Sequence, residues 1–192
     1  TRGLGVERLT ETAVVANGKA YELDCLIFAT GLEVGTAYTR RAGYDIVGRN
    51  GITLSEHWAD GLRTLHGLTT HGFPNCFFLG FTQTAITISV PQALNEQANH
   101  VAYMVREARE RGRPVLEPTA EAEAAYVEEI RSLMRVGQRF YMECTPGYYN
   151  SEGAAGNRNG FFSEMYGAGP LKFFDKLAAW RADGRLEGLA LR

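Results

Sequence analysis

The chain has 192 residues, 45% of them hydrophobic and 22% charged, which is enough apolar material for a sizeable core and excludes a disordered chain. Its 20 basic and 22 acidic side chains leave a net charge of -2, which also excludes the strong positive field of a nucleic-acid-binding or membrane-surface protein. No apolar run is long enough to cross a membrane, and residues 1–10 lack a signal-peptide pattern, which favours a cytoplasmic protein.

The N-terminal residues carry a β pattern. The chain opens Thr-Arg-Gly without Met and reaches this pattern within a few residues, as expected of an internal segment of a longer protein. Residues 12–16 are a short apolar run, Asn17-Gly18 is a strong hairpin signal, and residues 21–29 continue as a second strand. Residues 25–29 are continuously apolar, which predicts a strand covered on both faces, as in the parallel sheet of an α/β protein.

The middle of the chain is predicted to be irregular until a second buried strand. Glycines punctuate residues 32–75, and residues 76–80 then repeat the design of an apolar strand ending in Gly. A helix is predicted over residues 91–112, with Ser89 as a possible N-cap and Pro91 in the first turn. Its apolar positions recur at helical spacing: Leu94, Ala98, Val101, Ala102 and Val105.

Two more helices and one long loop are predicted after Gly112. Residues 119–138 form a helix whose acids, best interpreted as a solvated face, are Glu121, Glu123, Glu128 and Glu129. Residues 141–169 are rich in Gly, Asn and aromatic side chains without periodicity, which predicts an ordered or gated loop. The last helix spans residues 170–182 and ends at Gly184.

The cysteines and histidines predict neither a disulfide framework nor a metal site. Cys25, Cys76 and Cys144 form no C-x-x-C pair, so reduced structural thiols are expected. The histidines lack metal-ligand spacing, which favours structural or solvent-facing roles. They are His57, His66, His71 and His100.

Small residues end the first predicted buried strand. Because Gly31 has no Cβ, a planar or phosphorylated group can lie directly against the backbone there; an ordinary turn is the alternative. The run from Asp24 to Gly31 resembles the D-x-x-I-x-A-T-G signature of flavoproteins with two dinucleotide-binding domains, class B flavin monooxygenases in particular. Residues 51–58, 64–67 and 72–80 resemble, in order and spacing, the segments that follow this turn in Baeyer–Villiger monooxygenases. Residues 144–153, 169–181 and 184–189 resemble that family's C-terminal region.

The resemblance implies an α/β fragment of a two-dinucleotide-binding-domain flavoprotein. Residues 1–31 would end the NADPH-binding domain, residues 32–112 would form the C-terminal part of the FAD-binding domain, and residues 113–192 would form a helical C-terminal region with an NADPH and substrate loop. Neither G-x-G-x-x-G fingerprint of the family occurs in this sequence, nor does its catalytic arginine, so the catalytic residues are expected upstream and none is assigned here. The missing N-terminal part of the same protein is therefore an expected partner.

The function that the resemblance implies is FAD- and NADPH-dependent insertion of one oxygen atom of O2 next to a ketone, which gives an ester or lactone. Two alternatives stay open. A related class B flavin monooxygenase would oxidise nitrogen or sulfur instead, and a non-catalytic ligand-binding or interaction domain would have no redox role.

The resemblance also implies cofactor-binding residues. Ala29, Thr30 and Gly31 match the turn beside the flavin nucleotide. Residues 80–91 match the strand, loop and helix N-terminus beside the isoalloxazine ring, whose pyrimidine edge suits the free N–H groups of a helix N-terminus. The residues assigned there are Gly80, Gln83, Thr87, Ser89, Val90 and Pro91.

Two of these assignments compete with a simpler role. For Gln83 and Thr87, capping and loop hydrogen bonding is an equal alternative to cofactor contact. Tyr148 lies in residues 148–160, which match a family region that folds over NADPH and substrate, so its ring is expected to stack or to donate a hydrogen bond. A plain surface loop is the alternative for that segment.

Overall fold

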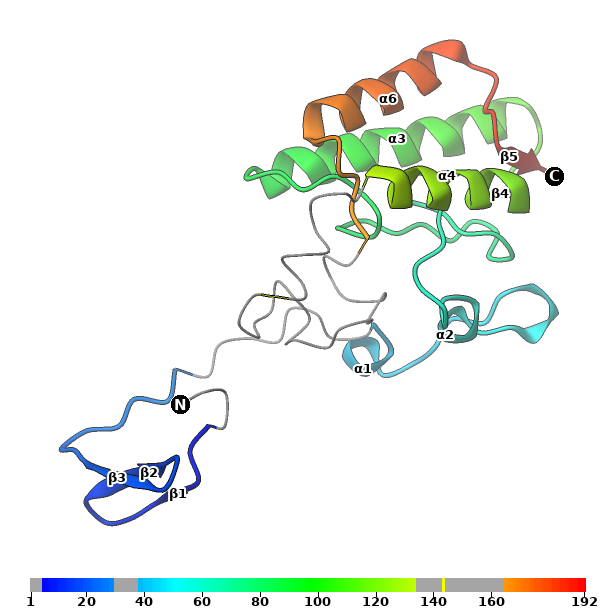
Figure 1. Cartoon of the computed structure of the whole chain (residues 1–192). Helices are drawn as coiled ribbons and strands as arrows, with labels where there is room; N and C mark the ends of the chain where they lie inside the picture. The colour runs from blue at the N-terminus through cyan, green and yellow to red at the C-terminus, as the bar shows by residue number, and fades with distance from the viewer. Residues whose placement is uncertain (1–4, 30–37, 134–142, 144–163) are drawn as a thin grey trace. The chain divides into compact units, whose positions relative to one another are not determined.

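The computed structural model describes residues 5–29, 38–133, 143 and 164–192 (Figure 1). The chain divides into two compact units, Thr1–Glu33 and Val34–Arg192. In the described strands all pairing is antiparallel, so these residues form a mixed α/β fold without the parallel sheet that the sequence suggests.

The N-terminal unit is a three-stranded sheet in the order β1-β2-β3. Its strands are β1 (Arg8–Leu9), β2 (Ala13–Ala16) and β3 (Lys19–Glu22). Asn17 and Gly18 turn the chain between β2 and β3 with φ of 53° and 70°, the left-handed values that a two-residue hairpin requires. The predicted hairpin is therefore confirmed.

The predicted strands over residues 25–29 and 76–80 are wrong. Neither segment belongs to a strand, and in the first the side chains of Ile27 and Phe28 are 81% and 68% exposed. A buried strand needs neighbouring strands at its edges and a layer over each face. The described residues pair neither segment with a strand. Residues 76–80 receive single hydrogen bonds, such as that from Phe78 N to Leu68 O at 2.8 Å, and pack against two apolar cores through Phe77 and Phe78.

The second unit begins with short elements. These are α1 (Tyr38–Ala42), the 3-10 turn η1 (Arg49–Gly51) and α2 (Leu54–His57). At the start of α2, Thr53 Oγ1 accepts from Glu56 N while the Glu56 carboxylate accepts from Thr53 N, which is a capping box. Leu54, Trp58, Leu62 and Phe73 then form a small core beside α2.

Three longer helices and a two-stranded sheet follow among the described residues of this unit. They are α3 (Val90–Glu110), β4 (Leu116–Pro118), α4 (Ala120–Leu133), α6 (Pro170–Asp183) and β5 (Leu189–Leu191). β5 pairs antiparallel with β4, and α6 runs beside α3 (Figure 1). Gly184 closes α6 in the left-handed conformation with φ of 70°, as predicted. The predicted residues 134–138 of the second helix and the predicted loop up to residue 163, apart from residue 143, lie outside the described residues.

Two apolar cores hold these helices together. Tyr126 and Ile130 of α4 pack with Phe173 and Leu177 of α6. Met104 and Ala108 of α3 pack with Leu116 of β4. None of the helices that the structure describes is long and apolar enough to cross a membrane.

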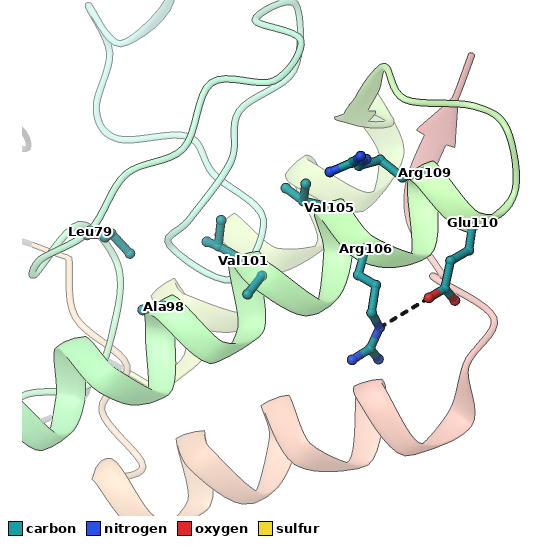
Figure 2. A pocket seen from close by; sticks show the side chains of 8 residues that line it. Leu79, Ala98, Val101, Val105, Arg106, Arg109 and Glu110 are labelled. Carbon is teal, nitrogen blue, oxygen red and sulfur yellow. Dashed lines mark ion pairs between the residues drawn. The ribbon is translucent and has the colours of Figure 1, made fainter.

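The buried face of α3 is not its apolar stripe. The buried side chains are Ala93, Gln97, His100, Met104 and Ala108. The apolar positions at helical spacing lie on another side, where Ala98 and Ala102 are exposed and Val101 is half-buried. They border the α3 groove, of about 710 Å³, whose lining is Leu79, Ala98, Val101, Ala102, Val105, Arg106, Arg109 and Glu110 (Figure 2). Two polar side chains, Gln97 and His100, therefore lie on the inner face of α3, while Ala98 and Ala102 face outward.

Candidate functional site

The N-terminus of α3 is open. Ser89 stands at the N-cap, but its side chain makes no capping hydrogen bond, and Pro91 has no N–H. The first hydrogen bond of the helix runs from Ala93 N to Ser89 O at 3.2 Å, so the N–H groups of Val90 and Gln92 have no acceptor within the helix. Ser89, Val90 and Pro91 are all exposed. This end of α3 can therefore receive an electron-rich group.

Gly80 begins the 80–89 loop that leads into α3. Its φ is +144°, a conformation that side-chain-bearing residues rarely adopt, and no atom lies within 4 Å of the place where a Cβ would stand. The side-chain amide of Gln97 forms hydrogen bonds with both backbone groups of Gly80: Gly80 N donates to Gln97 Oε1 at 2.8 Å, and Gln97 Nε2 donates to Gly80 O at 2.9 Å. Thr84 Oγ1 also donates to Gly80 O at 2.8 Å. The start of the loop is fixed while one side of Gly80 stays open.

Gln83 turns its side chain into the protein. It is fully buried, has φ of 53°, and donates from Nε2 to Leu62 O at 2.9 Å and to Glu164 Oε2 at 2.8 Å. Its Oε1 accepts from Thr64 Oγ1 at 2.6 Å, and its backbone O accepts from Tyr126 OH at 2.8 Å. This is the loop hydrogen-bonding role that the sequence left open for Gln83. Its side chain is saturated by protein partners.

Thr87 has a similar local role. Its Oγ1 accepts from Ser89 N at 3.3 Å, just before the helix. The side chain is only half-buried, so Thr87 keeps one face toward solvent beside the α3 terminus.

The turn at Gly67 braces the 80–89 loop. Gly67 N donates to Thr64 Oγ1 at 3.1 Å, and a Cβ on Gly67 would stand 2.2 Å from Thr82 O. The backbone of Gly67 therefore packs directly against the backbone of Thr82. Together with the Gln83 hydrogen bonds, it gives the loop a single conformation in front of α3.

Glu123 of α4 holds the segment around this turn. The prediction of a solvated acidic face is therefore wrong for Glu123, whereas Glu121 and Glu128 are exposed and Glu129 is half-buried. Glu123 is 1% exposed and accepts from Arg63 Nε at 3.1 Å, from Thr70 Oγ1 at 2.9 Å and from His71 N at 2.7 Å; His57 Nε2 lies 3.2 Å away. Burial raises the pKa of this carboxyl, but the hydrogen bonds from His57, His71 and Thr70 together outweigh burial and hold the pKa below its usual value.

His66 and His100 meet in the core, although 34 residues separate them. His66 Nδ1 lies 3.3 Å from His100 Nε2, and Arg181 Nη1 lies 3.4 Å from His100 Nδ1. Because arginine only donates, the proton of a neutral His100 lies on Nε2 and points at His66. Burial lowers the pKa of His66 well below its usual value, and burial together with Arg181 lowers the pKa of His100 to about 3. The described residues include no group of three or more His, Cys, Asp or Glu that could hold a metal ion.

The structure thus gathers six of the ten residues assigned from the sequence into one loop and helix terminus. Ala29 lies in the N-terminal unit, and Thr30, Gly31 and Tyr148 lie outside the described residues. Sequence reasoning missed Gln97 and Thr64, which hold this loop, and Glu123, which holds the neighbouring segment from Arg63 to His71. A buried side-chain amide on a helix has no local signal, because its partners lie elsewhere in the chain.

Comparison with known sequences gives consistent matches, although no family model matches the chain. A pentalenolactone D synthase of Streptomyces exfoliatus is 50% identical over 194 residues, which are 100% of this chain and 33% of that protein. A Baeyer–Villiger monooxygenase of Dietzia sp. is 40% identical over 96% of this chain and 30% of that protein. An FAD-binding monooxygenase of Penicillium brasilianum is 37% identical over 97% of this chain and 31% of that protein. The chain spans about a third of the length of these curated relatives.

Solved structures agree. A polycyclic ketone monooxygenase from the fungus Thermothelomyces thermophila matches with a TM-score of 0.77 and 30% identity, over 98% of this chain and 31% of that chain. A cyclohexanone monooxygenase from Rhodococcus sp. Phi1 bound to NADP+ matches with a TM-score of 0.76 and 26% identity, over 97% of this chain and 34% of that one.

The class that fold and sequence define is that of the Baeyer–Villiger monooxygenases: over its whole length, the chain corresponds to a portion, about one third, of such an enzyme. This confirms the resemblance noted in the sequence. Within the class, about half of its residues are identical to those of pentalenolactone D synthases.

Proposed function

We propose that the chain is part of an FAD- and NADPH-dependent monooxygenase that inserts one oxygen atom of O2 next to the carbonyl of a small-molecule ketone and yields an ester or lactone. The observation that carries the proposal is the open N-terminus of α3, braced by the 80–89 loop, in a chain that matches Baeyer–Villiger monooxygenases throughout. The FAD and NADPH assignments follow the names of relatives described as FAD-binding or bound to NADP+.

We assign residues 1–31 to the end of the NADPH-binding domain, residues 32–112 to the FAD-binding domain and residues 113–192 to a helical C-terminal region. The division of the chain into compact units after Glu33 supports the first boundary. The fragment alone is expected to be inactive, because the dinucleotide fingerprints and the catalytic arginine of the class are absent from its sequence.

The residues present fit a flavin ring at the α3 terminus. When bound, FAD supplies the redox chemistry, accepting hydride from NADPH and passing electrons to O2. The free N–H groups of Val90 and Gln92 would donate to the pyrimidine edge of the ring, and the helix dipole would favour the negative charge that this edge gains on reduction. Gly80 leaves room beside the ring, since it has no Cβ and an open side.

The α3 groove is the surface that we assign to the rest of the enzyme. Its walls are mostly apolar, and the Arg106–Glu110 ion pair of 3.9 Å closes one end (Figure 2). Exposed apolar surface of this kind is typical of a contact that another part of a protein covers. The curated relatives are about three times as long as this chain, which supports a contact with the N-terminal part of the same protein.

One substitution separates the role of the α3 terminus in flavin binding from its role in stability. Ser89→Asp places a carboxylate at an N-cap that lacks a side-chain hydrogen bond, so it should stabilise α3 by about 0.5–1 kcal/mol. The same carboxylate occupies the free N–H groups and repels a reduced flavin, so the flavin midpoint potential of the full-length protein should fall. Ser89→Ala is the matched control and should change neither quantity. An unchanged flavin midpoint potential in Ser89→Asp would show that the flavin does not bind at this helix end.

The reaction itself is tested with the full-length protein, NADPH and a panel of ketones, amines and thioethers. Ester or lactone formation from a ketone is the expected result. Oxygenation of nitrogen or sulfur with no ester formed would reject the Baeyer–Villiger reaction in favour of a related class B activity. If the full-length protein showed no flavin absorbance, the remaining function would be ligand binding or interaction without a redox role.

A further inference from the structure

Gln97 is one of two buried polar side chains on α3, with His100, and the proposed chemistry uses neither of them. Gln97 is 1% exposed and lies on the second turn of the helix, yet both ends of its amide bond to Gly80, 17 residues earlier. One amide therefore satisfies a backbone donor and a backbone acceptor at the same residue. Such a buried amide is costly unless both of its ends are paired.

Helix α3 holds both ends of the loop that leads into it. The 80–89 loop joins α3 covalently at Val90 and is held again at Gly80 by Gln97, so both ends of the loop are attached to one rigid element. Gly80 has a glycine-only conformation, and Thr84 Oγ1 bonds to the same Gly80 carbonyl. If Gln97 releases Gly80, the loop keeps its contacts at Gln83 and Gly67 and the hydrogen bond from Thr84 to Gly80, but its start loses both links to α3.

We propose that Gln97 is a positioning residue, which, without touching the flavin, fixes Gly80 and the 80–89 loop against α3 and thereby sets how tightly the flavin binds. The inference rests on the proposed function for the flavin, but the hold on the loop stands on geometry alone. Gln97 acts through Gly80, because the oxygen and the nitrogen of its amide each bond to that residue.

The first test removes the amide at nearly constant volume. Gln97→Met in the full-length protein should weaken FAD binding about tenfold or more, since two hydrogen bonds between buried groups are lost. Backbone amide hydrogen exchange over residues 80–89, measured without FAD, should become about tenfold faster or more. Asn99→Ala, an exposed amide on the same helix, is the matched control and should change neither quantity.

A second variant supplies a readout that a merely structural residue would not give. In Gln97→Glu, a protonated carboxyl has one donor and one acceptor, as the amide does, whereas a carboxylate faces the Gly80 carbonyl without a proton to donate. FAD binding should therefore approach that of the wild type at low pH and weaken as the pH rises. Burial raises the pKa of such a carboxyl, which brings its titration toward neutral pH.

The wild-type protein controls for the other titratable groups around this position. On the same buried face of α3, His100 has a pKa lowered by burial and by Arg181 to about 3 and stays neutral over the range used. Glu96 faces Arg181 of α6 at 3.7 Å. Both groups are present in every variant, so only the additional pH dependence of Gln97→Glu belongs to position 97.

The outcomes separate this inference from the proposed function. If wild-type protein binds no FAD, the proposed function fails, and hydrogen exchange still decides whether Gln97 holds the loop. Unchanged exchange over residues 80–89 in Gln97→Met overturns the positioning role. Faster exchange with unchanged FAD affinity, or a pH-independent Gln97→Glu variant, overturns the link between Gln97 and the flavin.

Discussion

Glu123 offers the sharpest test of how the candidate site is held in place. Its carboxylate is 1% exposed and joins α4 to the segment from Arg63 to His71. Glu123→Ala leaves the His71 N–H without its acceptor, at about 1–3 kcal/mol, whereas the Thr70 hydroxyl keeps Arg63 O at 2.7 Å as an acceptor. The Arg63 ion pair adds little, because the Arg63 side chain is 40% exposed. With the loss of the weaker contacts to Arg63 and His57, the expected total is about 2–4 kcal/mol.

The loss should be local and measurable. Because about 1.4 kcal/mol corresponds to a factor of ten, amide hydrogen exchange over residues 63–71 should become at least about thirtyfold faster, with a lower Tm. Glu123→Gln keeps the volume and part of the acceptor capacity, so about 1–2 kcal/mol is expected. Glu121→Ala is the matched control, since Glu121 lies two residues earlier on α4 and is exposed. If Glu123→Ala behaves like Glu121→Ala, Glu123 does not hold this segment.

The pH dependence of this prediction has a definite sign. The pKa of Glu123 is lower in the folded protein than its usual value of 4.5, so its contribution is complete above pH 4.5 and is lost as the pH falls through the folded-state pKa. The stability difference between the wild type and Glu123→Gln should therefore be constant near neutral pH and shrink below pH 4.5.

Three further predictions follow from the same packing. Gly67→Ala should destabilise the protein by about 3 kcal/mol or more and lower its FAD content, because the added Cβ would collide with Thr82 O. Gly112 has a similar φ but open space around it, so Gly112→Ala should lower the unfolding free energy by only about 1 kcal/mol. His66 and His100 have pKa values below 6.5 in the folded state, so the unfolding free energy should fall by up to about 1.4 kcal/mol per pH unit for each of them as the pH drops below 6.5. In His100→Gln, the unfolding free energy measured with urea should depend less steeply on pH. An equal pH dependence in the two proteins would refute the neutral pair. Ala102→Arg in the α3 groove should lower the soluble yield and flavin content of the full-length protein, and Ala125→Arg, on an exposed position of α4, should not; equal behaviour would show that the groove is not covered.

Local signals allowed several elements to be predicted from the sequence. Asn17-Gly18 determines the hairpin because its two residues alone satisfy the turn geometry. Pro91 and Gly184 mark the ends of α3 and α6 because their backbone constraints act at the residue itself. The α3 terminus could be located as a candidate site for the same reason, with the family resemblance indicating which ligand to expect.

The features that could not be predicted depend on distant partners. Helical periodicity sorts side chains by polarity, so it favoured the stripe around Val101 and could not show that Gln97 is paired with Gly80 or that His100 is paired with His66. The buried hydrogen-bonding role of Glu123 could not be predicted for the same reason, because its donors lie more than fifty residues away. The apolar run at residues 25–29 has strand composition, yet a strand exists only where a neighbour accepts its hydrogen bonds.

The hydrogen bonds of Gln83 carry a consequence for the order of events during synthesis. Its partners lie 19 residues before it at Thr64, 43 after it at Tyr126, and 81 after it at Glu164. The ribosome therefore releases the 80–89 loop long before it releases the groups that fix its shape, and closing contacts over such separations is slow. The loop reaches its final conformation only when residues near Glu164 have docked. A flavin that binds beside α3 is consequently taken up after this part of the chain is made, and early truncations should yield protein without flavin.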